Sequence, residues 1–149
     1  MWNDSRSLVL SKICVIVFMA FLLACAVLAP RLVTWLVSMS YYARIAGRTL
    51  FLSTIYIGCI PAAALLICLY LLLQRISADD VFVNRNITYL RYISWCCFIG
   101  AMICAVSAYY YLPWLAIGIA AAFMGLIVRI VKNVIAKAVS LQDDADYTI

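Results

Sequence analysis

Residues 49–73 read TLFLSTIYIGCIPAAALLICLYLLL, an apolar run that lies between Arg48 and Arg75. The run contains no Asp, Glu, Lys or Arg. As an α-helix it would be about 37 Å long, which exceeds the ~30 Å hydrocarbon core of a bilayer. An isolated strand is excluded, because lipid offers no hydrogen-bond partner to unpaired backbone groups. The run therefore predicts a transmembrane helix.

Three further apolar runs have the same character, and they cover residues 13–29, 92–111 and 113–128. None contains a formal charge, which would cost about 2.5–3.5 kcal/mol at the centre of a membrane helix. The last two runs almost touch, so the stretch from Ser107 to Trp114 must hold a turn, and Pro113 suits the first turn of the fourth helix. The sequence predicts an all-α polytopic membrane protein, a single domain over residues 1–149 with four transmembrane helices.

The composition agrees with a membrane protein. Apolar residues make up 69% of the 149 and charged residues 11%, whereas a soluble domain carries about 25% charged residues. The mean hydropathy is +1.12. A soluble fold of this size could not hide so much apolar surface from water. The net charge of +5 is not attributed to direct nucleic-acid binding, because the basic residues flank the apolar runs and indicate contact with the lipid bilayer.

The distribution of basic residues predicts the orientation. With the N-terminus in the cytoplasm, the cytoplasmic side holds eight Lys and Arg residues and the outer side holds three. The eight are Arg6, Lys12, Arg75, Arg85, Arg91, Arg129, Lys132 and Lys137, and the three are Arg31, Arg44 and Arg48. The sequence therefore predicts a multi-pass protein of the inner (plasma) membrane, with both termini in the cytoplasm.

Two segments outside the spans also have helical periodicity. Between Arg31 and Arg48, apolar residues recur at helical spacing, which is typical of a helix lying on the outer membrane surface. After the fourth span, one face is apolar (Ile130, Val131, Val134, Ile135, Ala138 and Leu141) and the other is polar (Arg129, Lys132, Asn133 and Lys137). The fourth span is therefore expected to continue as a cytoplasmic helical extension.

Residues that could carry catalysis are scarce. The chain has no His and no Glu, the usual general bases together with Asp. Its six aspartates all lie in the predicted cytoplasmic segments. The pair Asp79 and Asp80 without a third ligand is weak evidence for Mg²⁺, and negative charge near the start of the following helix is the simpler interpretation. We therefore expect no enzyme activity, and no catalytic, metal or cofactor site.

Transport is the second function class to consider. Ion-coupled carriers usually keep an ionisable group within the membrane, and the four runs hold none. Pro61 interrupts the second run, where it removes a backbone hydrogen bond and favours a kink. Broken helices line substrate sites in transporters, but a single proline more often serves packing. A small transporter, channel or immunity-type membrane component is therefore the alternative.

Small residues provide the clearest packing signal. The fourth run carries Gly118, Ala121, Ala122 and Gly125 on one face, and the third carries Gly100, Ala101, Cys104, Ala105 and Ala108. Such faces let two helix backbones approach closely. Contact within one chain is favoured, and contact between two copies in a homo-oligomer is the alternative. All seven cysteines lie within apolar runs and are expected to act as small hydrophobic residues.

Two short motifs give the chain a family resemblance. The inner loop between the second and third runs carries Phe82, Asn86, Leu90, Arg91 and Ile93. The C-terminus reads LQDDADYTI over residues 141–149. With the pattern of four spans, both motifs resemble DUF2975, a family of small bacterial four-span membrane proteins. Two departures are that Tyr147 replaces the usual Leu and that Arg85 stands where an acid is common.

The resemblance implies a four-span fold and no assigned activity. Members of the family often look to be encoded beside small helix-turn-helix regulators, which implies membrane-linked regulation. The expected function is a non-enzymatic interaction or regulatory subunit that acts on a cytoplasmic protein partner. Its expected contact residues are Phe82, Asn86, Arg91, Asp143, Asp144 and Asp146.

Each part of the cytoplasmic surface has an expected role. Phe82 is expected to anchor the inner loop, and Asn84 or Asn86 to cap the third helix. The acidic tail has two interaction modes open to it, besides simple solubilisation. It could dock on the basic inner surface formed by Arg75, Arg85 and Lys132, or on a basic soluble partner.

Overall fold

The computed structural model describes residues 4–79 and 82–148, and within these ranges it contains helices and no strand. The helices are α1 (Asp4–Met39), α2 (Tyr41–Ala46), α3 (Arg48–Ile76), α4 (Asn84–Ser107) and α5 (Pro113–Tyr147). Four of the described helices, all except α2, are long and apolar enough to cross a membrane. The prediction of an all-α protein with four membrane-spanning helices is confirmed.

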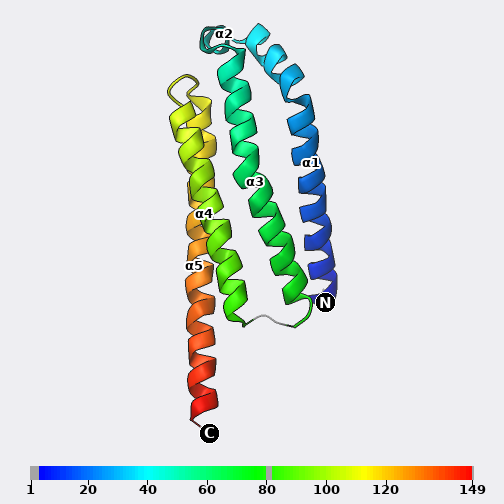
Figure 1. Cartoon of the computed structure of the whole chain (residues 1–149), viewed down its shortest axis with the longest axis vertical. Helices are drawn as coiled ribbons and strands as arrows, with labels where there is room; N and C mark the ends of the chain where they lie inside the picture. Colours follow the sequence, from blue (N-terminus) through cyan, green and yellow to red (C-terminus); the bar gives the residue numbers. More distant parts are fainter. Residues whose placement is uncertain (1–3, 80–81, 149) are drawn as a thin grey trace.

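The four long helices lie side by side in chain order (Figure 1). Helix α1 packs against α3, α3 against α4, and α4 against α5. In the described part of the chain, α1 contacts neither α4 nor α5. The helices therefore form an open row, in which α1 and α5 are the two edges.

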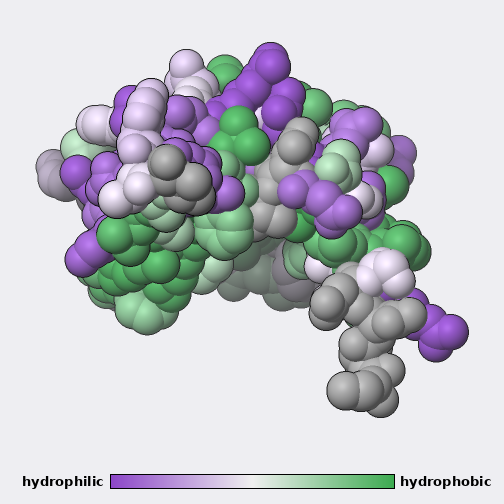
Figure 2. Space-filling view, turned by 90° about the horizontal axis from the view of Figure 1, so that it is seen from below, coloured by the Kyte–Doolittle hydropathy of each residue, from purple (hydrophilic) through white to green (hydrophobic). Residues whose placement is uncertain are grey.

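The two ends of this row are formed by different segments of the chain. The start of α1, the connection from α3 to α4 and the end of α5 lie together at the bottom of Figure 1, which we call the lower end. Helix α2 and the turn from α4 to α5 lie at the upper end. Figure 2, seen from below, shows hydrophilic side chains gathered over the lower end and apolar side chains along the flanks. Both ends of the described chain therefore lie on one side of the row, as an even number of spans requires.

The segment predicted as one surface helix is divided in two. Helix α1 continues without a break through Pro30 to Met39, and only Tyr41–Ala46 forms a separate helix. The hydroxyl of Thr34 donates to the carbonyl oxygen of Pro30 over 2.7 Å within α1. The chain then turns at Ser40, whose side chain accepts a hydrogen bond from the backbone N–H of Ala43. Helix α1 is about 54 Å long, so it extends well beyond a hydrocarbon core of ~30 Å.

An aromatic cluster at the upper end packs α3 against the turn between α4 and α5. The ring of Phe51 on α3 is buried and packs edge-on against Tyr110 and Tyr111, at centroid distances of 5.1 Å each. Beside it, the hydroxyl of Thr54 is hydrogen-bonded to Ser107 (2.9 Å) and to Tyr110 (2.6 Å). Pro113 begins α5, as predicted. These contacts join the short turn between α4 and α5 to the neighbouring helix α3.

Helices α4 and α5 approach most closely where small residues meet. A methyl group added at Gly125 would lie 2.9 Å from Cβ of Cys97, and one added at Gly118 would lie 3.1 Å from Cβ of Cys104. The hydroxyl of Ser94 donates to the carbonyl oxygen of Gly125 over 3.0 Å. The small-residue faces therefore meet within one chain, which is the arrangement the sequence favoured.

Candidate functional site

Helix α4 starts at the lower end, and its first turn differs from the prediction. Val83 occupies the N-cap position in an extended conformation, and its side chain makes no capping hydrogen bond. Asn84 is already the first helical residue, and Asn86 lies inside the first turn with 1% of its surface exposed. The prediction that Asn84 or Asn86 caps this helix is therefore wrong. Asn86 is instead a buried polar residue at the base of α4.

Phe82 lies just before this helix start, and 53% of its surface is exposed. Its ring is thus not inserted into the core of this chain. The core near the lower end is formed instead by Leu72, Leu90 and Ile93, against which Ile135 packs. Phe82 is therefore available to lipid or to another molecule.

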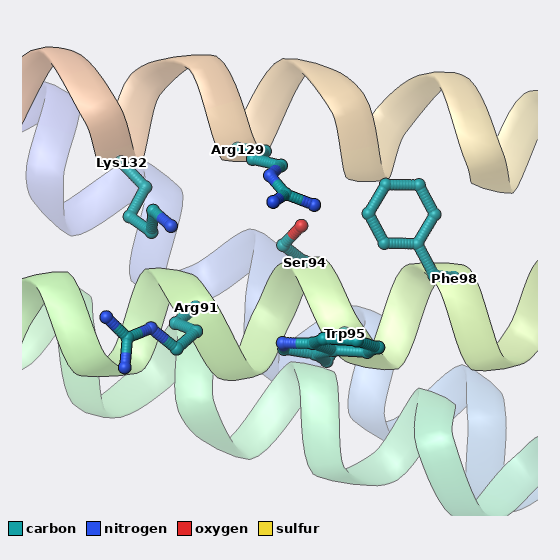
Figure 3. Close-up of a pocket in the computed structure, with 6 residues that line it drawn as sticks. All are labelled: Arg91, Ser94, Trp95, Phe98, Arg129 and Lys132. Carbon is teal, nitrogen blue, oxygen red and sulfur yellow. The ribbon is translucent and has the colours of Figure 1, made fainter.

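A small cationic pocket lies between α4 and α5, at the level of the contact of Ser94 with Gly125 and of the turn below it. Its volume is about 130 Å³, and its lining consists of Arg91, Ser94, Trp95, Phe98, Arg129 and Lys132. Figure 3 shows Arg129 and Lys132 pointing from α5 toward α4, while Phe98 points from α4 toward α5. No acidic residue of the described ranges lines the pocket. Three cations from two helices therefore surround one small space.

Helix α5 continues well past its neighbour. It is about 53 Å long and α4 about 36 Å, and the two helices meet at the same turn at the upper end, where α4 ends and α5 begins. The last part of α5 consequently projects below the rest of the row (Figure 1). Asp143, Asp144 and Asp146 are all exposed on this projection. Among the described residues, no ion pair joins these aspartates to a Lys or an Arg.

Docking of the acidic tail on the inner surface is therefore not observed. The helix carries the aspartates away from Arg75, Arg85 and Lys132 instead of folding back on them. Arg75 lies over the ring of Tyr89, with 5.9 Å between its guanidinium carbon and the ring centroid. A straight helix keeps every backbone hydrogen bond of residues 133–147, whereas folding back would break several of them.

The lower part of α5 has two apolar sides. Ile135 packs against the core cluster of the lower end, and Val139 is buried. Val134 and Leu141 remain 63% and 60% exposed. The apolar face predicted from the sequence is thus divided between a buried side and an unpartnered side. We call the exposed surface of Val134, Leu141, Asp143, Asp144 and Asp146 the α5 projection surface.

Comparison with known proteins decides the family. Residues 8–149 match the family described as a protein of unknown function, DUF2975. The chain belongs to the DUF2975 family. No curated protein and no solved structure matches it. The match covers nearly the whole chain, so the resemblance noted in the inner loop and the tail is confirmed as family membership.

The described residues of this DUF2975 protein hold no group of three or more His, Cys, Asp or Glu side chains that could bind a metal ion. Asp79 lies in the loop after α3 with a positive φ of 63°, and Asp80 lies outside the described residues. The hydroxyls within the spans bind one another or backbone oxygens: Ser53 donates to Leu50, and Thr54 is bonded to Ser107. No charged side chain takes part in these contacts.

The transport alternative depends on the region around Pro61. Helix α3 is continuous through this residue from Arg48 to Ile76. A cavity of about 430 Å³ opens beside it between α3, α4 and α5, and its lining includes Gly58, Pro61, Gly100 and Met124. Every lining residue is apolar or a cysteine. The cavity offers no charge or hydroxyl for a polar solute, so it suits an acyl chain or another apolar group.

The structure brings together some of the predicted site residues of this DUF2975 protein. Arg91 joins Arg129 and Lys132 in the cationic pocket, and the three tail aspartates share the α5 projection surface. Phe82 and Asn86 lie near the start of α4, away from both. Arg129 and Lys132 were not predicted as partners of Arg91. The available signal was their position, because Arg91 and Arg129 are equally far along the chain from the turn between the two helices.

Proposed function

We propose that this DUF2975 protein is a non-enzymatic regulatory subunit of the plasma membrane, which binds a basic cytoplasmic protein through the α5 projection surface. The observation that carries the proposal is a helix of 35 residues that leaves the row and presents exposed apolar and acidic side chains beyond it. A helix that served only to cross the membrane would not need these last turns.

The membrane orientation assumed in the proposal rests on the distribution of basic residues. The lower end has eight Lys and Arg residues in the sequence, and the upper end has three. Because cytoplasmic loops are enriched in basic residues, we assign the lower end to the cytoplasm. The projection then extends into the cytoplasm, and both termini lie there.

The placement of the aspartates supports an interaction role. Asp143, Asp144 and Asp146 lie in the last turns of α5, and no basic residue lies in the final turn. Negative charge near a helix C-terminus is unfavourable by about 0.3–1 kcal/mol for each group, since the helix dipole is negative there. Helix stability does not explain these residues. Ion pairs with a basic partner surface would offset this unfavourable energy.

The chemistry of the surface specifies the partner. Val134 and Leu141 lie seven residues apart, so they share one face of the helix. Such a face fits an apolar groove on another protein. A positively charged rim on that groove would pair with Asp144, which lies beside Leu141 around the helix, and basic residues beyond the rim would pair with Asp143 and Asp146. A small helix-turn-helix regulator, the partner implied by the family resemblance, would carry basic surface because it binds DNA phosphates.

Photo-crosslinking in native membranes tests the proposal. A photoreactive residue at Leu141 should capture one basic soluble protein, identified by mass spectrometry. The same residue at Tyr109, which is 98% exposed at the upper end, serves as the matched control and should not capture it. Combining Leu141 labelling with Asp143→Lys and Asp144→Lys should reduce the yield at least tenfold. Capture that is equal at both positions, or unchanged by the charge reversals, would refute the proposal.

The orientation is tested separately. Tags placed at the two termini should not react with labels added outside intact cells. Both should react once the membrane has been permeabilised. Labelling of either tag from outside would place the α5 projection surface on the wrong side of the membrane. The partner proposal would then be rejected, whatever the crosslinking result.

A further inference from the structure

The cationic pocket between α4 and α5 has a depth that can be estimated from helix geometry. Arg91 lies about 24 Å below the end of α4 at Ser107, and Arg129 lies about 24 Å below the start of α5 at Pro113, at a rise of 1.5 Å per residue. The tyrosines of the connecting turn mark one membrane boundary. A hydrocarbon core of ~30 Å then places both arginines at the inner edge of the membrane.

Charge at this depth needs a partner. Arginine stays protonated in proteins, and uncompensated cations within a few ångströms repel one another in a medium of low dielectric constant. No carboxylate lines the pocket, and no ion pair involves Arg91, Arg129 or Lys132 among the described residues. The pocket therefore concentrates positive charge that no carboxylate in residues 4–79 and 82–148 neutralises.

The lining changes character along the membrane normal. Arg91 and Lys132 lie on the side nearer the lower end, and Trp95 and Phe98 on the side nearer the membrane centre, with Arg129 between them (Figure 3). Trp95 is 59% exposed on the outside of the row. A single ligand could thus place a polar group at the lower side of the pocket and an attached apolar chain over the aromatic rings.

The contact between the helices fixes this geometry. Ser94 is buried and bonded to Gly125, so its position relative to α5 is set one turn above the charges. The close approach of Gly125 to Cys97 prevents the two helices from sliding freely. The backbones of Arg91 and Arg129 are consequently held at about one level on facing helices, while the guanidinium of Arg91 points toward the lower end (Figure 3). This fixed backbone geometry is the preorganisation that an anion site requires.

We propose that this pocket binds a phosphate group, and that the phosphate is carried by an anionic phospholipid whose acyl chain lies against Trp95 and Phe98. The guanidinium groups of Arg91 and Arg129 suit bidentate contacts with phosphate oxygens, and the ammonium of Lys132 adds a point charge. This inference goes beyond the proposed function and does not depend on it, because no residue of the α5 projection surface lines the pocket.

Native mass spectrometry of the full-length chain in detergent tests the inference. Titration with phosphatidylglycerol should give one saturable bound lipid per chain, and phosphatidylcholine, which has no net charge, should bind at least fivefold more weakly. Arg129→Gln should weaken phosphatidylglycerol binding about fivefold, and Arg91→Gln with Arg129→Gln about 25-fold, since each basic group near a membrane surface contributes about a fivefold factor. Lys132→Gln is the mildest variant, because the two arginines remain.

Lys137→Gln provides the matched control, since Lys137 is an exposed residue of α5 outside the pocket. It removes the same charge and should leave binding unchanged. Far-UV circular dichroism and gel filtration establish that each variant is folded. Equal affinity for the two lipids, or an equal loss in the control and the pocket variants, would overturn the inference.

A competition arm identifies the source of the phosphate. Inorganic phosphate at millimolar concentration should displace little phosphatidylglycerol, because it lacks the acyl chain that Trp95 and Phe98 contact. If inorganic phosphate binds with the same dependence on Arg91 and Arg129 while the lipid does not, the lipid carrier is rejected and the pocket is a site for soluble phosphate.

Discussion

Ser94 on α4 donates its hydroxyl to the backbone carbonyl oxygen of Gly125 on α5, and the two residues are buried together. The carbonyl belongs to a helix, so it accepts this bond in addition to its place in the helical ladder. The contact sets how far α4 and α5 are displaced along each other. It therefore links the packing of small residues above it to the cationic pocket below it.

Ser94→Ala should destabilise the chain by about 0.6 kcal/mol and by at most about 1.7 kcal/mol, the average and the maximum found for hydrogen bonds between membrane helices. Unfolding in mixed micelles, followed by circular dichroism, measures the loss. Ser53→Ala is the control, because the hydroxyl of Ser53 bonds to Leu50 within its own helix. A loss at Ser53 equal to that at Ser94 would show that the contact between helices contributes nothing of its own.

Gly125→Ala should destabilise the pair of helices by about 1–3 kcal/mol, as other overpacked sites do. The added methyl would lie 2.9 Å from Cβ of Cys97, and neither atom can move without shifting a helix. Gly100→Ala is the comparison, since nothing lies within 4 Å of a methyl group there. It should be neutral or stabilising, because Ala is the better helix former. The same unfolding measurement distinguishes them, and equal effects would contradict the close packing.

Thr54→Val should weaken the upper end by about 1–3 kcal/mol, because it leaves the buried hydroxyl of Ser107 without its partner. The variant keeps the volume of the side chain, so packing around Phe51 is preserved. Thr34→Val is the control, since the hydroxyl of Thr34 only bonds to its own helix. Amide hydrogen exchange of residues 104–112 should accelerate in the first variant and not in the second.

Asp144→Lys should have opposite effects on stability and on binding. It replaces an unfavourable charge near the C-terminus of α5 with a favourable one, so the last turns should gain about 0.3–1 kcal/mol. Amide exchange of residues 139–147 should slow by up to about fivefold. Binding of the basic partner should fall at the same time. If both quantities fall, the substitution has only disturbed the helix, and the evidence for a binding role of Asp144 disappears.

The sequence was sufficient to predict the membrane spans, but it did not predict where the helices begin and end. The apolar runs were clear because no formal charge interrupts them, and each lies mainly within one long helix of the structure. The first span was predicted to end at residue 29, whereas α1 continues through Pro30 to Met39. The cap of α4 was also predicted wrongly: Asn is a common capping residue, but burial of Asn86 and the extended backbone of Val83 place the helix start one residue earlier.

The cationic pocket shows why pairings between helices were harder to predict. Arg91 was predicted as a contact residue of the inner loop, but its neighbours depend on the relative displacement of α4 and α5. That displacement follows from the contacts at Gly118 and Gly125, which no periodicity within a single helix encodes. The small-residue faces indicated that the two helices meet, and the atomic contacts fixed which residues meet.

The turn between α4 and α5 has a consequence for biosynthesis. Residues 108–112 read AYYYL and contain no charge, and the aromatic contacts with Phe51 form only after α3 is in place. In the proposed orientation this turn must be translocated, and a neutral segment crosses hydrocarbon at far lower cost than a charged one. The last two helices can therefore enter the bilayer together as a hairpin, with their basic residues remaining behind on the side of the ribosome.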